Sequence, residues 1–347
     1  MINIKISVVI PNYNGEKYIQ RVVKSIQAQS VCVYEIIIVD DCSTDNSKNI
    51  ICALTQNNCR IKAIYLEKNL GVAHARNVGI KKASGEYILF ADVDDILPVD
   101  AILHYSEAMN QFEGMNIYQG MQDMRGSGKT YLLDVNTLKK LCLGYPRSLL
   151  YFNNLSVSVK NSVHGCYGKL YNREFLNTNK IEFRQNMGLG EDLVFYYEVL
   201  KYSENVCIIE HEVYKIIYET GSATRSFNPK MSEYALTFAK IIRMVENNPI
   251  YKNEIAYQIN QHVNKAFQCN YGHPQNTEPY FKRVKEFKIF LSNSEIHNAY
   301  IELANTSNGV HKIRYELLKH KHALFYFMVS KIERWYIMSK DKKRRYK

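Results

Sequence analysis

Two aspartates near residue 93 are the part of this sequence best suited to chemistry. Asp92 and Asp94 directly follow residues 87–90, a run able to form a short buried strand. Alternate residues of an extended segment point the same way, so both carboxylates can face one hard cation and leave positions for water or phosphate oxygens. Aspartate is also a frequent turn former, so a solvated acidic turn is the alternative.

Two more acidic pairs occur at comparable places. Asp40 and Asp41 end the nearly continuous apolar run 35–39, which is typical of a strand covered on both faces. Glu191 and Asp192 open an apolar stretch with helical spacing. The helix dipole favours acidic residues at such a start, so a purely structural role is the alternative for either residue alone.

The first hundred residues alternate between short strands and helices. Strands are predicted at residues 4–10, 35–39, 61–66 and 87–90. This alternation predicts an α/β fold, a mostly parallel wound sheet with helices on both faces. Ligands in such sheets lie beyond the carboxyl ends of the strands, where Pro11, Asp40 with Asp41, and Asp92 with Asp94 are expected to converge.

Phosphate must be held here without a glycine-rich loop. Neither GxGxxG nor GxxxxGK[ST] follows the first predicted strand, where Asn14 is instead the expected cap of the next helix. A cation held by carboxylates is the obvious substitute. This argument favours a metal site at Asp92 and Asp94 over an acidic turn.

The later chain divides into two kinds of sequence. Further helices are predicted at 98–112 and 136–143, and strands at 206–209 and 213–218. After residue 229 the pattern is helical and polar. We therefore expect a catalytic domain over residues 1–225 and a helical C-terminal region over residues 226–347.

Composition narrows the class of protein. The chain has 347 residues, 46% of them hydrophobic, and eight cysteines without metal-ligand spacing, which indicates a globular protein with reduced thiols. The net charge is +11, yet residues 311–347 hold 12 Lys or Arg against three Asp or Glu. Because the excess is local, no nucleic-acid partner is expected. With no signal peptide or spanning segment predicted, the expected location is cytoplasmic.

The basic C-terminal end has its own pattern. In residues 319–347 an apolar run at 323–329 is followed by Ile332, Trp335 and Met338, and then by a Lys- and Arg-rich end. Such a segment suits peripheral attachment to an anionic membrane surface, the inner face of the cell membrane. The alternative is a terminal helix docked on the protein.

Five segments occur in the order and spacing of one enzyme family. They are residues 7–14 (SVVIPNYN), 39–45 (VDDCSTD), 69–77 (NLGVAHARN), 92–94 (DVD) and 190–192 (GED). Together they resemble the inverting family 2 glycosyltransferases of GT-A fold, of the bacterial surface-polysaccharide type. The resemblance covers roughly residues 4–225 and does not reach the C-terminal region.

The resemblance implies a site for a nucleotide-sugar donor. Asp41, and with it Asp40, would contact the nucleotide base. Pro11 and Tyr13 would line the same pocket. Arg76, on the helix after the 69–71 turn, would reach the nucleotide.

It also implies the catalytic groups. Asp92 would face the ribose and the metal, and Asp94 would ligate a divalent cation, Mn²⁺ or Mg²⁺, that bridges the diphosphate. Asp192 would be the general base, and Lys169 would help to place the sugar. A late segment near the diphosphate would include Ser222, Thr224 and Arg225.

The implied reaction is one displacement at the anomeric carbon. An acceptor hydroxyl on a glycan or a lipid-linked glycan attacks as the nucleoside diphosphate leaves, with a UDP-sugar as the expected donor. Many family members carry Trp where this chain has Tyr167 or Leu193, which leaves the acceptor open. The alternative function is a catalytically silent relative that binds nucleotide sugar or glycan within an assembly complex.

Overall fold

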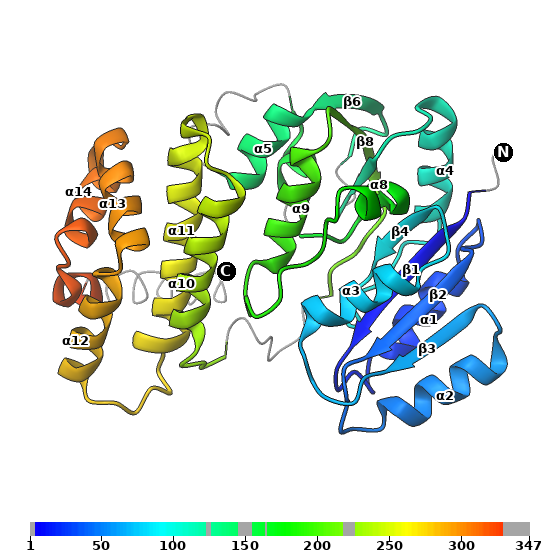
Figure 1. Ribbon diagram of the computed structural model, residues 1–347, viewed down its shortest axis with the longest axis horizontal. Coiled ribbons are helices and arrows are strands. Elements are labelled where there is room, and N and C mark those ends of the chain that lie inside the picture. Colours follow the sequence, from blue (N-terminus) through cyan, green and yellow to red (C-terminus); the bar gives the residue numbers. More distant parts are fainter. Residues whose placement is uncertain (1–3, 123–125, 145–154, 164, 218–225, 329–347) are drawn as a thin grey trace, which may run out of the picture. The chain divides into compact units, whose positions relative to one another are not determined.

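The computed structural model describes residues 4–122, 126–144, 155–163, 165–217 and 226–328. The chain forms two compact units, one of residues 1–142 with 146–219 and one of residues 143–145 with 220–347 (Figure 1). The predicted domain boundary at residue 225 falls outside the described residues.

One eight-stranded sheet, in the order β3-β2-β1-β4-β7-β5-β8-β6, forms the centre of the first unit. Its strands are β1 (Ile6–Asn12), β2 (Glu35–Asp40), β3 (Ile61–Tyr65), β4 (Tyr87–Phe90), β5 (Ile117–Met121), β6 (Thr130–Asp134), β7 (Lys169–Asn172) and β8 (Asn205–Glu212). β1 to β4 pair in parallel, as do β5 and β8, whereas β7 and β6 pair antiparallel with their neighbours. The predicted wound sheet is confirmed, with a mixed second half.

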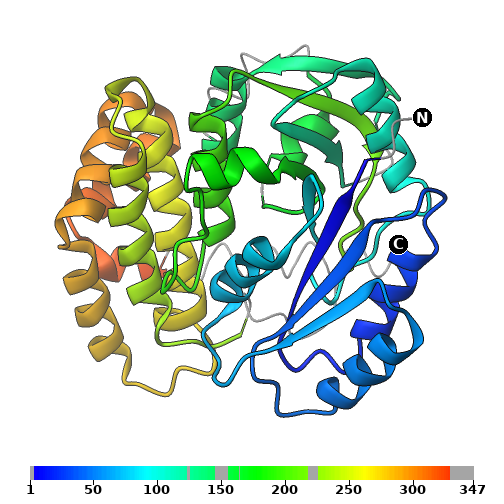
Figure 2. The ribbon, with the colours of Figure 1, turned by 45° about the vertical axis from the view of Figure 1, so that its right-hand side comes forward.

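Helices cover both faces of this sheet (Figures 1 and 2). Those that begin in the first unit are α1 (Ile19–Gln27), α2 (Ser47–Asn57), α3 (Val72–Lys82), α4 (Ala101–Gln111), α5 (Val135–Leu143), α7 (Val157–Ser162), α8 (Arg173–Thr178) and α9 (Glu191–Lys201). Buried residues of α1, α2 and α4 share a core with Val8 and Ile38. α3 packs on the other face so closely that a Cβ at Gly79 would lie 2.2 Å from Val9 Cγ1.

Three local predictions differ from the structure. β1 continues through Asn12, because Pro11 and Asn12 still pair with β2. α1 begins at Ile19 after Tyr18, so Asn14 is not its cap; the Asn14 side chain instead accepts a hydrogen bond from the Thr44 backbone N–H (2.8 Å). The strand predicted at 213–218 is reduced, within the described residues, to one bridge between Ile96 and Lys215.

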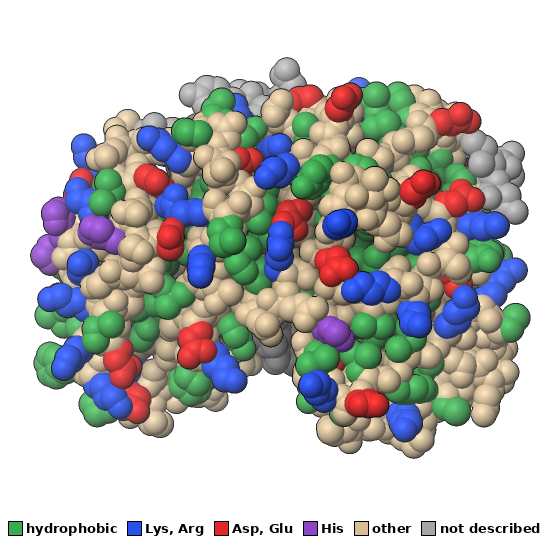
Figure 3. Space-filling model, in the orientation of Figure 1, with side chains coloured by type: hydrophobic (Ala, Val, Ile, Leu, Met, Phe, Trp, Pro, Cys, Tyr) green, Lys and Arg blue, Asp and Glu red, His purple; other side chains and the backbone are tan. Residues whose placement is uncertain are grey.

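The second unit is helical, as predicted for the C-terminal region. Its elements are α10 (Met231–Val245), a 3₁₀ turn (Pro249–Tyr251), α11 (Lys252–Ala266), a π-helical segment (Phe267–Tyr271), α12 (Tyr280–Leu291), α13 (Ser294–Thr306) and α14 (Gly309–Lys319). Among the described residues no helix has the length and apolar character needed to cross a membrane. On the face drawn in Figure 3, Lys and Arg are interspersed with Asp and Glu.

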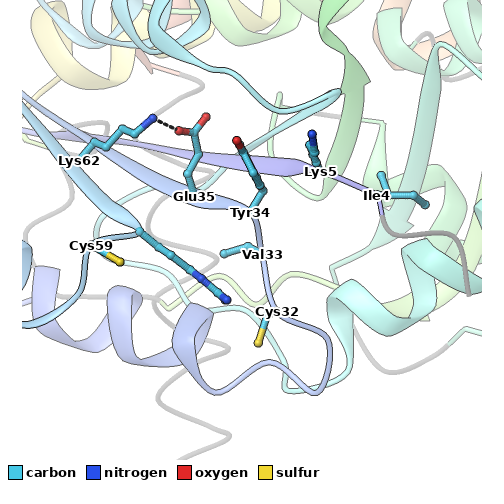
Figure 4. Close-up of a pocket in the computed structure, with 9 residues that line it drawn as sticks. Ile4, Lys5, Cys32, Val33, Tyr34, Glu35, Cys59 and Lys62 are labelled. Atoms are coloured by element: carbon cyan, nitrogen blue, oxygen red, sulfur yellow. Dashed lines mark ion pairs between the residues drawn. The ribbon is translucent and has the colours of Figure 1, made fainter.

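A pocket of about 470 Å³ lies at the amino ends of β1, β2 and β3 (Figure 4). Glu35 in its wall is 2% exposed and bonded to Ser7, Ser84 and Lys62. Burial alone would raise the pKa of Glu35, but these hydrogen bonds, led by the one from Lys62, lower it to about 2. The acidic residues of interest follow the opposite, carboxyl ends of the strands.

Replacing Glu35 with Gln is expected to lower the free energy of unfolding by about 2–3 kcal/mol at pH 7. The folded carboxylate stays ionised below the pH at which the unfolded one gains its proton. Its contribution is therefore complete above about pH 5 and lost as the pH falls towards 2. Urea denaturation of both proteins between pH 7 and pH 2 should show their difference narrowing, whereas exposed Glu86→Gln should have little effect at any pH. A difference that stays constant on acidification would contradict this account.

Candidate active site

The acidic loop is residues 92–95, directly after β4. The Ala91 backbone N–H still donates to the Val9 carbonyl (3.0 Å), and the Asp95 N–H then closes a turn onto the Asp92 carbonyl (3.2 Å). Asp92 and Asp94 are partly exposed and Asp95 is buried. The strand therefore delivers Asp92 and Asp94 to the surface at its carboxyl end, as predicted.

Asp95 supports this loop from below. Its carboxylate accepts hydrogen bonds from the Tyr214 hydroxyl (2.8 Å) and the Ile217 backbone N–H (2.9 Å). Burial raises the pKa of Asp95 to about 7, despite these two bonds. Its side chain is thus committed to the protein interior.

Arg76 connects the acidic loop to α9. Its guanidinium lies 2.8 Å from Asp92 Oδ1 and 3.1 Å from Glu191 Oε1, and the side chain is buried. Burial alone would lower the pKa of Arg76, but the neighbouring carboxylates, Asp92 and then Glu191, raise it well above its usual value. Arg76 is therefore a permanent cation whose described contacts are with protein carboxylates.

Glu191 and Asp192 form the first turn of α9. Gly190 before them has φ +81°, a left-handed conformation that glycine adopts without strain. Asp192 is partly exposed, and its Oδ1 accepts the Leu193 backbone N–H (2.8 Å). Burial and the adjacent Asp192 raise the pKa of Glu191, while Arg76 acts in the opposite direction. The two carboxylates thus differ. Glu191 forms an ion pair with Arg76, whereas Asp192 bonds to the backbone of its own helix.

Asp41 organises the turn before α3. Its two carboxylate oxygens accept the backbone N–H groups of Leu70 (2.8 Å) and Gly71 (2.7 Å). Its own N–H donates to the Asn12 carbonyl (2.8 Å), which ties the end of β1 to the same place. A carboxylate has about four acceptor positions, so this one keeps capacity for a ligand.

Asp40 holds the neighbouring loop. It accepts from Asn12 Nδ2 (2.7 Å), the Ser43 hydroxyl (2.6 Å) and the Ser43 N–H (3.1 Å). Pro11 is buried within β1, whereas Tyr13 is 51% exposed. Of these side chains, the Tyr13 ring has the most surface available to a ligand.

Lys169 does not have the predicted role. It is fully buried, and its ammonium donates to the carbonyls of Ser162 (2.8 Å) and Gly165 (2.9 Å). Burial lowers the pKa of Lys169 to about 8. The prediction that Lys169 places the sugar was therefore wrong, because the residue shapes the loop before β7 from inside.

The predicted residues therefore form two groups. Arg76 joins Asp92 and Glu191 by two ion pairs, with Asp192 next to Glu191 in the first turn of α9. Asp40 and Asp41 anchor the loops after β2 and before α3. The late segment containing Ser222, Thr224 and Arg225 lies outside the described residues. The structural roles of Asn12 and Tyr214 were not predicted, because the register that pairs Asn12 with Asp40 and the bonds of Tyr214 appear only in the folded chain.

The donor set suits a hard cation. Carboxylate oxygens are the protein ligands that Mg²⁺ prefers, and Asp92 and Asp94 lie two positions apart in the turn that the Asp95 N–H closes onto the Asp92 carbonyl, not on an extended segment as predicted. The described chain contains no group of three or more His, Cys, Asp and Glu side chains able to hold a metal ion. Two carboxylates alone supply only part of a cation's ligands, which suits a cation bound together with a diphosphate.

Comparison with known proteins identifies the family. The model of "Glycosyl transferase family 2" matches residues 7–178. The putative teichuronic acid biosynthesis glycosyltransferase TuaG of Bacillus subtilis is 33% identical over 213 residues, which cover 60% of this chain and 79% of the relative. The chain belongs to glycosyl transferase family 2. This family 2 glycosyltransferase is therefore an enzyme, as predicted.

Two further comparisons extend over more of the chain. The poly(ribitol-phosphate) beta-N-acetylglucosaminyltransferase TarP of Staphylococcus aureus is 26% identical over 264 residues, covering 72% of this family 2 glycosyltransferase and 75% of TarP. The crystal structure of S. aureus TarS 1-349 in complex with UDP-GlcNAc matches with a TM-score of 0.65 at 18% identity, covering 95% of this chain and 92% of that one. At this identity the structural match shows the fold, and it agrees with the GT-A prediction.

Arg76 is expected to stabilise the site itself. Arg76→Met removes the cation and leaves Asp92 and Glu191 without it in a largely buried place, so we expect a loss of about 3–5 kcal/mol in the free energy of unfolding. Lys81→Met is the control on the same helix, because Lys81 and its partner Glu182 are both exposed (63% and 47%). The control should cost less than about 0.5 kcal/mol. Equal urea midpoints for the two variants would refute the structural role of Arg76.

Proposed function

We propose that this family 2 glycosyltransferase is a metal-dependent, inverting enzyme that moves a sugar from a nucleotide-diphosphate donor, a UDP-sugar, to a hydroxyl of a surface glycan or lipid-linked glycan. One observation carries the proposal. Arg76 holds Asp92 and Glu191 at 2.8 and 3.1 Å, which sets the acidic loop beside the first turn of α9. The proposed metal ligands and the proposed base, which come from two different elements, would thereby act on the same substrate.

The donor would bind across the carboxyl ends of β1, β2 and β4. In the proposal, the base lies against Tyr13 and Pro11 and is contacted by Asp41, whose loop is already fixed by the Leu70 and Gly71 amides. Asp40 acts on the same pocket by holding the Ser43 loop. Because these carboxylates are bonded in advance, little ordering remains to be done when the nucleotide binds.

Asp92 and Asp94 would hold a divalent cation, Mn²⁺ or Mg²⁺, with diphosphate oxygens completing its ligands. When bound, such a cation supplies positive charge that stabilises the departing diphosphate. Arg76 adds a fixed positive charge on the protein side of Asp92. The two ion pairs use one N–H on each terminal nitrogen of Arg76, so its remaining N–H groups would be the ones to reach the nucleotide.

Asp192 is the proposed general base. It takes the proton from the acceptor hydroxyl as that oxygen forms a bond to the anomeric carbon. The bond from this carbon to the diphosphate oxygen breaks, and its electron pair leaves with the nucleoside diphosphate. Base assistance of this kind contributes about 10²- to 10⁴-fold in rate. Glu191 is the weaker candidate, because Arg76 already occupies it.

The surface-glycan acceptor is supported by the comparisons. One relative is named for teichuronic acid biosynthesis and another for poly(ribitol phosphate), and a protein of the same fold binds UDP-GlcNAc. We extend these chemical classes to this enzyme as its acceptor and donor types. A catalytically silent binding protein would not need Asp192. The enzyme is therefore expected to lose transfer when Asp192 is replaced, whereas a silent relative would show no transfer to lose.

Asp192→Asn and Asp94→Asn are expected to fail in different ways. Asp192→Asn should bind UDP in the presence of Mn²⁺ as wild type does and lose about 10²- to 10⁴-fold in transfer from a panel of UDP-sugars. Asp94→Asn should lose Mn²⁺-dependent UDP binding, measured by calorimetry. Asp100→Asn, an exposed aspartate before α4, is the surface control. Full transfer by Asp192→Asn would remove it from the base role, and a wild type indifferent to every nucleotide sugar with metal present would refute the enzyme proposal.

The C-terminal end is the proposed membrane contact. Residues 323–328 are helical, and their Ala323, Tyr326 and Phe327 are buried, with Phe327 packed 4.8 Å from Phe267. Residues 323–328 thus agree with the alternative prediction of a terminal helix docked on the protein. On the same helix Leu324, Phe325 and Met328 are about half exposed. The predicted stripe and basic end at 329–347 lie outside the described residues. A truncation at 318 would remove core residues, so charge neutralisation is the cleaner test.

The full chain is expected to sediment with vesicles containing phosphatidylserine and not with pure phosphatidylcholine. Replacing Lys340, Lys342, Lys343, Arg344 and Arg345 with Gln should abolish this, because each basic residue near such a surface contributes about 1 kcal/mol. A second variant with Gln at Lys282, Lys285 and Lys288 of α12 controls for general loss of charge. Undiminished sedimentation of the first variant would show that this end does not bind membrane.

A further inference from the structure

The hydroxyl of Tyr214 lies directly beneath the acidic loop. Tyr214 is fully buried and comes from the segment just after β8. Its oxygen accepts the Asp92 backbone N–H (2.9 Å) and donates to Asp95 Oδ2 (2.8 Å). One side chain, 122 positions away in sequence, therefore bonds to both ends of the loop.

The direction of these bonds is fixed by the Asp92 amide. Its N–H can only donate, so the Tyr214 oxygen accepts this bond and directs its own O–H to Asp95 Oδ2. The second Asp95 oxygen is occupied by the Ile217 N–H (2.9 Å). The Asp92 amide is thereby oriented from below, and with it the peptide plane from which Asp92 leaves the strand.

The Tyr214 ring is held from two further sides. The Tyr167 ring stacks on it with centroids 4.9 Å apart and planes 19° from parallel. Gly168 has φ +66°, and a Cβ there would come 3.3 Å from Tyr214 Cβ, so the chain passes close to it. The next residue, Lys215, exchanges two backbone hydrogen bonds with Ile96 (3.0 and 3.2 Å). The hydroxyl is thus carried by a ring with little freedom to move.

We propose that Tyr214, held by Asp95, is a positioning residue for the cation site: its hydroxyl sets the direction of the acidic loop so that Asp92 and Asp94 face the same ligand. This inference rests on the proposed function, in which the acidic loop binds the cation. Tyr214 acts through Asp92 and does not itself touch the donor. Groups of this kind, behind metal-binding carboxylates, are typically worth 10- to 100-fold in metal affinity or activity.

A purely structural role makes a different prediction, and the chain provides a matched comparison. Tyr118 is also fully buried, and its hydroxyl also bridges two groups, donating to the Phe112 carbonyl and accepting the Met115 N–H (3.3 Å). Its bonds serve the connection between α4 and β5. Tyr118→Phe and Tyr214→Phe therefore remove the same atom from similar surroundings, and only the second touches the acidic loop.

Two measurements on the full chain test the proposal. The first is residue-resolved hydrogen exchange of the Asp92 amide without metal, which should accelerate at least tenfold in Tyr214→Phe and stay unchanged in Tyr118→Phe. The second is calorimetric UDP binding over a range of Mn²⁺ concentrations. Tyr214→Phe should need 10- to 100-fold more Mn²⁺ for half-maximal binding, and Tyr118→Phe the same amount as wild type. Asp95→Asn, which keeps one acceptor oxygen, should shift both readouts in the same direction and serves if Tyr214→Phe does not fold.

The outcomes separate the inference from the function on which it rests. Wild-type Mn²⁺ dependence in a folded Tyr214→Phe protein, or in Asp95→Asn if only that variant folds, overturns the positioning role. Equal shifts in Tyr118→Phe and Tyr214→Phe overturn it as well, because they reveal a general loss of stability. If wild-type protein binds no UDP with Mn²⁺, the proposed function fails, and accelerated Asp92 exchange in Tyr214→Phe still shows that the hydroxyl holds the loop.

Discussion

A buried arginine must keep its charge, and in this enzyme that requirement organises the site. Arg76 is 4% exposed, and its guanidinium lies between Asp92 and Glu191 with the Phe183 ring 5.2 Å from its centre. Without the carboxylates the desolvated cation would be strongly destabilising, and without the cation the carboxylates would repel. The three groups therefore require one another, and they come from α3, the end of β4 and the start of α9. The position of α3 is set in turn by Gly79 against Val9, which lets the helix approach the sheet closely enough for Arg76 to reach both partners.

The carboxylates of the site differ in how they are already used. Asp40, Asp41 and Asp95 accept hydrogen bonds from backbone N–H groups and from side-chain amide and hydroxyl groups, which fixes loops. Asp192 accepts a hydrogen bond from the adjacent Leu193 amide, and one carboxylate oxygen of Asp92 pairs with Arg76. A pre-organised site uses some acidic side chains to hold its loops and others to contact the ligand. The loops are then ordered during folding, and little ordering is left for ligand binding. Acid residues close in sequence thus have unequal roles.

The same distinction explains what the sequence could predict. The apolar runs before Asp40 and Asp92 and the helical spacing after Asp192 are local patterns, so the strands, the helix and the carboxyl-end placement followed from them. The burial of Lys169, the partners of Arg76 and the bonds of Tyr214 depend on segments far apart in the chain. A lysine at the start of a strand looks the same in sequence whether its ammonium faces a sugar or the carbonyls of the preceding loop. Tyr214 stands in an ordinary apolar stretch, and only tertiary structure shows where its hydroxyl points.

The long separations between partners also bear on how the enzyme is made. The Arg76–Glu191 and Asp92–Tyr214 bonds join residues 115 and 122 positions apart, so neither forms until most of the first unit has been synthesised. The segment that matches the family model ends at residue 178, before Asp192 and Tyr214. A nascent chain released at that point would contain every strand end proposed to bind the donor, yet leave Arg76 without one of its two carboxylates. Non-local closure of this kind is slow, so completion of the active site belongs to the last stage of biogenesis.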